Sequence, residues 1–194
     1  MIFDFLTANW FEIVAAALAI TYLILAMQQN ILCWAAWIIS SIMYLFVMFS
    51  AGLYMESGLQ IFYIVMGIYG WIQWNNRSSN NSLTVSTWPI INHIYILLIL
   101  IFLVTFSGLI LSNLTEAVSP YIDAFTTWGA IIATYMVAKK ILENWYYWFV
   151  VDFVSVFLFL SRELYTTALL FSIYIILVIF GFIAWRKSMR LENV

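Results

Sequence analysis

Residues 143–152 read ENWYYWFVVD, an apolar stretch that carries two tryptophans three positions apart, an asparagine and an aspartate. At a constant offset of 111 positions, residues 32–41 read LCWAAWIISS and hold two tryptophans in the same register. Shared apolar bias explains matching leucines more easily than matching tryptophans. The pair therefore indicates an internal repeat in which only the second copy carries Asn144 and Asp152.

The repeat extends beyond the tryptophan pair at the same offset. Residues 53–74 and 164–185 share nine identities over 22 aligned positions, without a gap. In the first copy these are Leu53, Tyr54, Leu59, Tyr63, Ile64, Ile68, Gly70, Ile72 and Trp74. Their counterparts are Leu164, Tyr165, Leu170, Tyr174, Ile175, Ile179, Gly181, Ile183 and Trp185. We interpret the pattern as a duplication.

The composition predicts an integral membrane protein. Of 194 residues, 66% are hydrophobic and 8% are charged, whereas a soluble domain carries about 25% charged residues. A bilayer core of about 30 Å needs roughly 20 apolar residues in each spanning helix. No secretory presequence is expected, because Asp4 and Glu12 stand where a signal peptide would be basic. An all-α protein with seven transmembrane helices is predicted, near 10–28, 31–50, 58–75, 90–112, 121–138, 144–160 and 164–186.

The duplication and the seven segments together predict a 3+1+3 organisation. Residues 1–75 form the first three-helix repeat, 76–120 a polar linker and connecting fourth helix, and 121–194 the second three-helix repeat. Four spans separate equivalent helices, and this even number gives both repeats the same orientation in the membrane. Parallel repeats of this kind occur in SWEET transporters, with the substrate site near the bilayer midplane at the repeat interface. We therefore expect a SWEET-like fold with such a site.

The placement of the cations predicts the orientation. Six of the seven lie on one side of the predicted spans, namely Arg77, Lys139, Lys140, Arg186, Lys187 and Arg190. Only Arg162 lies on the other side. Lysine and arginine favour the cytoplasmic side, so we expect a basic, cytoplasmic C-terminus and an external N-terminus. The Asn- and Ser-rich stretch 75–88 is expected to be a mobile linker.

Several classes of function are excluded by what the sequence lacks. A single cysteine, Cys33, allows no internal disulfide, and a single histidine, His93, builds no histidine cluster for a metal. A net charge of −2 with scattered cations argues against a nucleic-acid partner. No HExxH motif, Gly-rich phosphate loop or nucleophile–base pattern is present, so neither an enzyme nor a bound cofactor is predicted.

Two polar and aromatic stripes are candidates for the lining of a site. One combines Gln60, Tyr63, Gly67, Trp71 and Trp74, whose spacing places them on one helix face. The other combines Asn144, Trp148, Asp152 and Ser155. A carboxylate inside a span is costly and faces a cavity or a partner by default. A flat, polar, aromatic solute would suit such a lining.

Other interpretations of these residues stay open. Asp152 could be protonated or could form a structural tie within its own half. For Trp71 and Trp74, near the end of a span, a role in the interfacial aromatic belt is as well supported as a role in a site. The belt is the better interpretation for Trp10, Trp88 and Trp185.

The stretches GLQIFYIVMGIYGWIQW at 58–74 and ENWYYWFVVDFVSVFLF at 143–159 resemble the signature segments of the bacterial Pnu-type vitamin transporters, specifically those that carry nicotinamide riboside. The resemblance covers nearly the whole chain. It implies a homotrimer in which each protomer holds its own substrate path. It also implies facilitated diffusion of nicotinamide riboside across the cytoplasmic membrane without an ion or ATP, followed by trapping through cytoplasmic phosphorylation.

The resemblance also implies the substrate-binding residues. These are Gln60, Tyr63, Trp71 and Trp74 in the first repeat and Asn144, Trp145, Trp148 and Asp152 in the second. Aromatic rings would sandwich the pyridinium of the substrate, while Asn144, Gln60 and Asp152 would bind ribose hydroxyls or the carboxamide. A phosphorylated nucleotide would meet no lysine or arginine in the spans. Because the substrate is asymmetric, the two repeats would need different polar residues.

Three alternatives remain at this stage. The chain could transport a sister vitamin, thiamine or riboflavin, on the same scaffold. It could couple uptake to protons through Asp152. It could also be a membrane receptor or assembly subunit, whose polar stripes only pack helices and which would bind no small solute.

Overall fold

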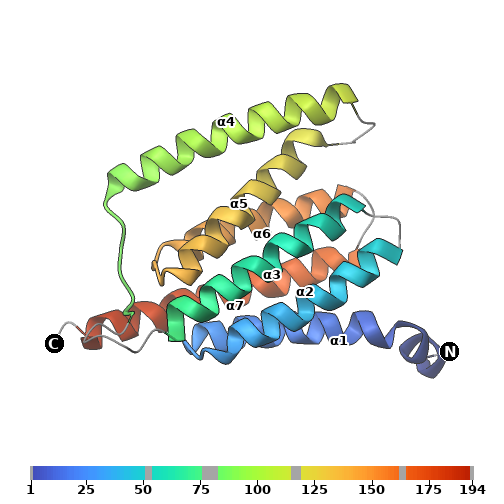
Figure 1. Ribbon diagram of the computed structural model, residues 1–194, viewed down its shortest axis with the longest axis horizontal. Helices are drawn as coiled ribbons and strands as arrows, with labels where there is room; N and C mark the ends of the chain where they lie inside the picture. The colour runs from blue at the N-terminus through green and yellow to red at the C-terminus, as the bar shows by residue number, and fades with distance from the viewer. Residues whose placement is uncertain (1, 51–53, 76–82, 115–118, 162–164, 193–194) are drawn as a thin grey trace. The chain divides into compact units, whose positions relative to one another are not determined.

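The computed structural model describes residues 2–50, 54–75, 83–114, 119–161 and 165–192, and these ranges contain seven α-helices (Figure 1). The all-helical prediction is confirmed, and the two predicted ends that differ most are the start of the first helix and the end of the last. The last helix continues past residue 186 because its Lys, Arg, Met and Leu residues are strong helix formers. The helices are α1 Ile2–Met27, α2 Leu32–Ser50, α3 Tyr54–Asn75, α4 Ile90–Leu114, α5 Pro120–Ala138, α6 Asn144–Ser161 and α7 Tyr165–Glu192.

The helices form two compact units, Met1–Leu83 and Thr84–Val194. In the first unit, α1 packs on α2 and α2 packs on α3. In the second unit the helices again pack in sequence order, from α4 through α5 and α6 to α7. The rows α1–α3 and α5–α7 thus have the same neighbour pattern, and α4 packs on α5.

Within the described residues, three helical stretches are long and apolar enough to cross a membrane: Ile90–Leu114, Asn144–Ser161 and Ala168–Leu191. Shorter apolar stretches lie at Ile13–Met27 and Leu32–Val47. Much of this apolar surface is exposed. On α4, for example, Leu98 is 59% exposed and Phe102 is 65% exposed. Water would not favour such a surface, so lipid or another protein chain must cover it.

The first loop of each repeat has the same backbone structure. Gln29, after α1, and Lys140, after α5, have positive φ angles of 54° and 51°, and their positions differ by the repeat offset. In the first loop the Asn30 N–H donates to the Leu25 carbonyl at 2.9 Å, and in the second the Ile141 N–H donates to the Met136 carbonyl at 2.9 Å. This is the Schellman bond that closes a helix C-terminus. The repeat is therefore present in the backbone as well as in the sequence.

A tryptophan pair also recurs in each unit at equivalent positions. The Trp34 and Trp74 ring centroids lie 5.5 Å apart with an interplanar angle of 84°. The Trp145 and Trp185 centroids lie 5.3 Å apart at 87°. Trp185 is completely buried, so the expectation that it belongs to an interfacial belt is wrong. Its indole packs edge to face against another indole instead.

The two repeated glycines make room for these indoles. A Cβ atom added at Gly70 would overlap the Trp34 ring, and one added at Gly181 would overlap the Trp145 ring. Gly181→Ala is therefore expected to destabilise the protein by about 1–3 kcal/mol, the usual cost of overpacking a core. Thermal unfolding in detergent measures the loss. Gly58→Ala is the control, since its Cβ would meet nothing within 4 Å, and equal melting temperatures for the two variants would contradict the tight fit.

Part of the predicted mobile linker is fixed to the loop between α5 and α6. The Ser86 N–H donates to the Lys140 carbonyl at 3.1 Å, and the Leu142 N–H donates to the Ser86 carbonyl at 2.8 Å. The Trp88 N–H donates to Glu143 Oε2 at 3.3 Å. The expectation of mobility is thus wrong for residues 84–88, because backbone pairing holds them, while 76–82 lie outside the described residues.

Candidate functional site

Helix α6 carries its polar residues on a buried face. Asn144 is fully buried, while Asp152 and Ser155 are each 3% exposed. Trp148, between Asn144 and Asp152 on the same face, is half-buried. Successive spacings of four, four and three residues hold these side chains on one side of the helix. The predicted stripe of the second repeat is therefore one face of α6, and its polar side chains are buried inside the unit.

Asn144 has both a structural role and an unused hydrogen-bonding atom. Its Nδ2 donates to the Ile141 carbonyl at 2.6 Å, which closes the loop before α6. Its Oδ1 is buried and accepts no hydrogen bond within the described part of the chain. A buried unsatisfied polar group costs about 1–3 kcal/mol. The atom is therefore a candidate acceptor for a donor that a ligand would bring.

Asp152 is a carboxyl group inside an apolar helix. No hydrogen bond or ion pair joins its side chain to another residue in the ranges that the structure covers. Its counterpart in the first repeat is Ser41, which is also buried, at 5% exposure. The second repeat thus places a far more costly group where the first repeat has a hydroxyl. Packing alone gives no reason for this choice.

The two equivalent tryptophans Trp37 and Trp148 have different surroundings. Trp37 Nε1 donates to the Tyr63 carbonyl at 2.9 Å. Its ring lies 4.4 Å from the Tyr22 ring and 5.1 Å from the Tyr63 ring, between centroids. The position equivalent to Tyr22 is Ala133, which brings no ring. Trp148 is half-buried and has no ring contact or hydrogen bond to any described residue.

The difference between Tyr22 and Ala133 is visible in the sequence at the repeat offset. In the first unit, Tyr22 fills the space beside the tryptophans with the protein's own ring, at 6.1 Å from Trp34 as well. In the second unit, Ala133 is fully buried and small. The second unit therefore lacks the aromatic contact that Tyr22 makes in the first unit.

The four predicted residues of α3 are all half-buried, and they fall into two groups. Tyr63 packs against Trp37, and Trp74 packs against Trp34. Gln60 and Trp71, by contrast, make no hydrogen bond or ring contact with any other described residue. The same division holds in α6, where Trp145 packs against Trp185 while Trp148 and Asp152 have no such partner.

Among the described residues, no three His, Cys, Asp or Glu side chains are close enough to hold a metal ion. His93 Nδ1 lies 3.0 Å from the Tyr147 hydroxyl, and the two rings stack with centroids 5.9 Å apart. His93, at the start of α4, thus pairs with the phenol of Tyr147 on α6.

These features define a class of protein. Long apolar helices with exposed hydrophobic faces and buried, unpaired polar and aromatic side chains are typical of a helical membrane protein that handles a small solute. Residues 9–187 match the family described as nicotinamide mononucleotide transporter. The chain belongs to this family of bacterial membrane transporters, and the resemblance inferred from its motifs is confirmed.

Individual relatives agree with this assignment. The chain is 24% identical to the nicotinamide riboside transporter PnuC of Escherichia coli K12, over 94% of this chain and 87% of that protein. It is 26% identical to the riboflavin/roseoflavin transporter RibM of Streptomyces davaonensis, over 95% and 88%. Its fold is similar to the crystal structure of the vitamin B3 transporter PnuC, with a TM-score of 0.79, 19% identity and coverage of 97% and 86%.

Proposed function

We propose that this protein carries nicotinamide riboside across the bacterial cytoplasmic membrane by facilitated diffusion. Within the family, the observation that carries the proposal is the half-buried indole of Trp148, which has no ring or hydrogen-bonding partner among the described residues and lies on the same face as the buried Asp152. Nicotinamide riboside has a flat, positively charged ring and a sugar with hydroxyl groups. An indole face attracts such a cation, by about 2 kcal/mol when the contact is desolvated, and a carboxylate accepts hydrogen bonds from hydroxyls.

We assign different roles to the eight candidate residues according to the contacts that each makes. Trp148 and Trp71 offer ring faces to the pyridinium. Asp152, Gln60 and the Asn144 Oδ1 atom offer hydrogen bonds to the ribose hydroxyls and the carboxamide. The other three, Tyr63, Trp74 and Trp145, are packed against indoles of their own unit and act by holding helix positions.

The same residues favour the nucleoside over its phosphorylated form. Helices α1 to α6 contain no lysine or arginine. A phosphate group entering them would lose its hydration without gaining an opposite charge. The substrate is therefore the riboside rather than the mononucleotide of the family's description, and phosphorylation by a cytoplasmic kinase would trap it. In the proposed orientation the C-terminus is cytoplasmic, and phosphorylation would occur on that side of the membrane, where the substrate leaves the protein.

Further elements of the proposal concern assembly and energy. A parallel 3+1+3 arrangement of the repeats and a homotrimer with one path per protomer follow from the resemblance. Mass measurement on purified particles would then give about three times the 22.6 kDa of one chain. No ion gradient is part of the proposal, because the resemblance implies facilitated diffusion, and Asp152 is the residue at which proton coupling is tested.

Riboflavin is the second candidate, and the similarity to RibM favours it. Equilibrium binding to the purified protein separates the candidates, with nicotinamide riboside, riboflavin, thiamine and nicotinamide mononucleotide tested side by side. Nicotinamide riboside is expected to bind at least about 10-fold more tightly than the others, since each 1.4 kcal/mol of added contact gives a factor of ten. Tighter binding of riboflavin or thiamine would keep the fold and change the substrate. Binding of none would favour a non-transport protein.

A further inference from the structure

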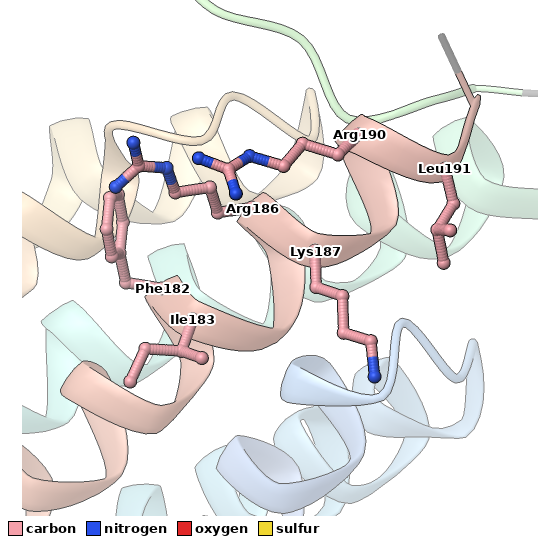
Figure 2. A pocket seen from close by; sticks show the side chains of 6 residues that line it. All are labelled: Phe182, Ile183, Arg186, Lys187, Arg190 and Leu191. Atoms are coloured by element: carbon pink, nitrogen blue, oxygen red, sulfur yellow. The ribbon is translucent and has the colours of Figure 1, made fainter. Parts of the chain in front are cut away.

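The C-terminal turns of α7 form a cationic pocket that plays no part in the proposed transport path. An open pocket of about 400 Å³ is lined by Phe182, Ile183, Arg186, Lys187, Arg190 and Leu191 (Figure 2). The three cations are exposed, whereas Phe182 is half-buried. Residues spaced by three and by four along a helix share one side of it, so the three cations lie on one side of α7, between the apolar residues that line the two ends of the pocket.

The two arginines are arranged to bind the same anion. The Arg186 guanidinium lies over the Phe182 ring, 5.8 Å from its centroid. The Arg190 side chain extends in the same direction, while Lys187 turns to the other side of the pocket (Figure 2). No carboxylate of a described residue forms an ion pair with any of these three cations. Like charges on one face repel unless an anion neutralises them, and two guanidinium groups bind phosphate well.

An apolar stripe leads directly into this pocket along α7. Ile176, Phe180 and Ile183 are 54%, 58% and 56% exposed, and their helical spacing continues to Lys187 and Arg190. Cations at the end of an exposed apolar span lie at the membrane surface, where lipid headgroups are. The surface thus offers contacts for a hydrocarbon chain and, at its end, for a phosphate.

We propose that this face of α7 is a binding site for an anionic phospholipid. The phosphodiester lies between Arg186 and Arg190, Lys187 contacts the outer part of the headgroup, and an acyl chain follows Ile183, Phe180 and Ile176. A free phosphate would use the cations but not the apolar stripe, and for this reason the lipid is the better fit. The proposal requires only that α7 spans the membrane and is independent of the substrate.

Lipid titration tests the proposal. The purified protein is titrated with phosphatidylglycerol or with phosphatidylcholine, and native mass spectrometry counts the bound lipid. Arg186→Gln/Arg190→Gln should weaken phosphatidylglycerol binding by about 30-fold, the expected effect of two surface cations. The control variant Lys139→Gln/Lys140→Gln removes the same charge elsewhere in the unit. It should change phosphatidylglycerol binding by less than about threefold. Arg186→Lys/Arg190→Lys should restore most of the binding. Nicotinamide riboside binding should be unchanged in all three variants.

Three outcomes would overturn the proposal. Equal loss of phosphatidylglycerol in both glutamine variants would show a response to total charge rather than a site. Equal binding of phosphatidylcholine would show that the headgroup charge is not recognised. Full displacement of the lipid by inorganic phosphate at the same phosphate concentration would assign the pocket to a free anion.

Discussion

Trp148→Ala is expected to weaken nicotinamide riboside binding by about 10- to 100-fold, because stacking on one aromatic side chain contributes about 1–3 kcal/mol. The indole of Trp148 is half-buried and has no ring or hydrogen-bonding partner among the described residues, so Trp148→Ala breaks no internal contact of either kind. Calorimetric titration of the purified protein measures the affinity. Trp148→Phe keeps an aromatic face and should remain within about fivefold of the wild type, since phenylalanine is the weaker partner for a cation.

The control for this prediction is the equivalent tryptophan of the first repeat. Trp37 donates a hydrogen bond to the Tyr63 carbonyl and contacts two tyrosine rings. Trp37→Ala should therefore lower the melting temperature, by a loss of about 3–5 kcal/mol in stability, and leave the affinity of the folded protein nearly unchanged. Wild-type affinity in Trp148→Ala would remove Trp148 from the site.

Asp152→Ala is expected to slow nicotinamide riboside uptake by about 10-fold, since leaving a buried hydrogen-bonding partner unsatisfied costs about 1–3 kcal/mol. The carboxyl group is 3% exposed and has no partner among the described residues, so a ligand is the candidate to satisfy it. Initial rates into sealed vesicles, with equal pH on both sides, measure the effect. Ser41→Ala changes the equivalent buried position of the first repeat and should alter the rate by less than about twofold.

Asp152→Asn separates binding from proton coupling. The amide keeps the shape and one acceptor oxygen but cannot exchange a proton. Under facilitated diffusion, wild-type uptake should be insensitive to an imposed proton gradient, and the variant should retain a reduced uptake with the same insensitivity. Wild-type uptake that rises with the gradient, together with loss of that response in Asp152→Asn, would establish proton coupling instead.

The duplication connects the fold to the proposed function. Both units build the same loop around Gln29 or Lys140 and the same edge-to-face tryptophan pair. They differ at the next tryptophan, where the first unit supplies Tyr22 and the second supplies Ala133. The first copy thus has an aromatic contact at this position that the second copy lacks. A duplicated scaffold acquires an asymmetric site through such local differences, at low risk to the shared framework.

The helices could be predicted from the sequence because a membrane restricts the choices. Long apolar segments must form helices in lipid, and breaker residues mark most of their ends. Asn30 and Pro120, for example, lie at or next to helix starts that were predicted within one residue. The repeat was equally accessible, because tryptophan and glycine coincidences at one offset reflect the close packing of Gly70 on Trp34 and of Gly181 on Trp145.

The roles of individual aromatic residues could not be predicted in this way. Belt, core and site tryptophans share the same composition and spacing, and only their neighbours distinguish them. Trp185 lies near the end of a span and yet is fully buried. Backbone pairing of Ser86 with the loop around Lys140 has no local signal, because it joins segments far apart in the chain. Which of the eight candidate residues contact the substrate stays a prediction.

Vesicle uptake tests the central claim most directly. Entry of radiolabelled nicotinamide riboside is measured into sealed vesicles that contain the purified protein, without any ion gradient, ATP or kinase. We expect entry that stops when the internal and external concentrations are equal, with no entry of nicotinamide mononucleotide. Both results follow from a path that binds the uncharged sugar and cationic ring but offers no counter-charge to phosphate. No entry of nicotinamide riboside, or accumulation above the external concentration under a proton gradient with the membrane potential held at zero, would contradict the claim.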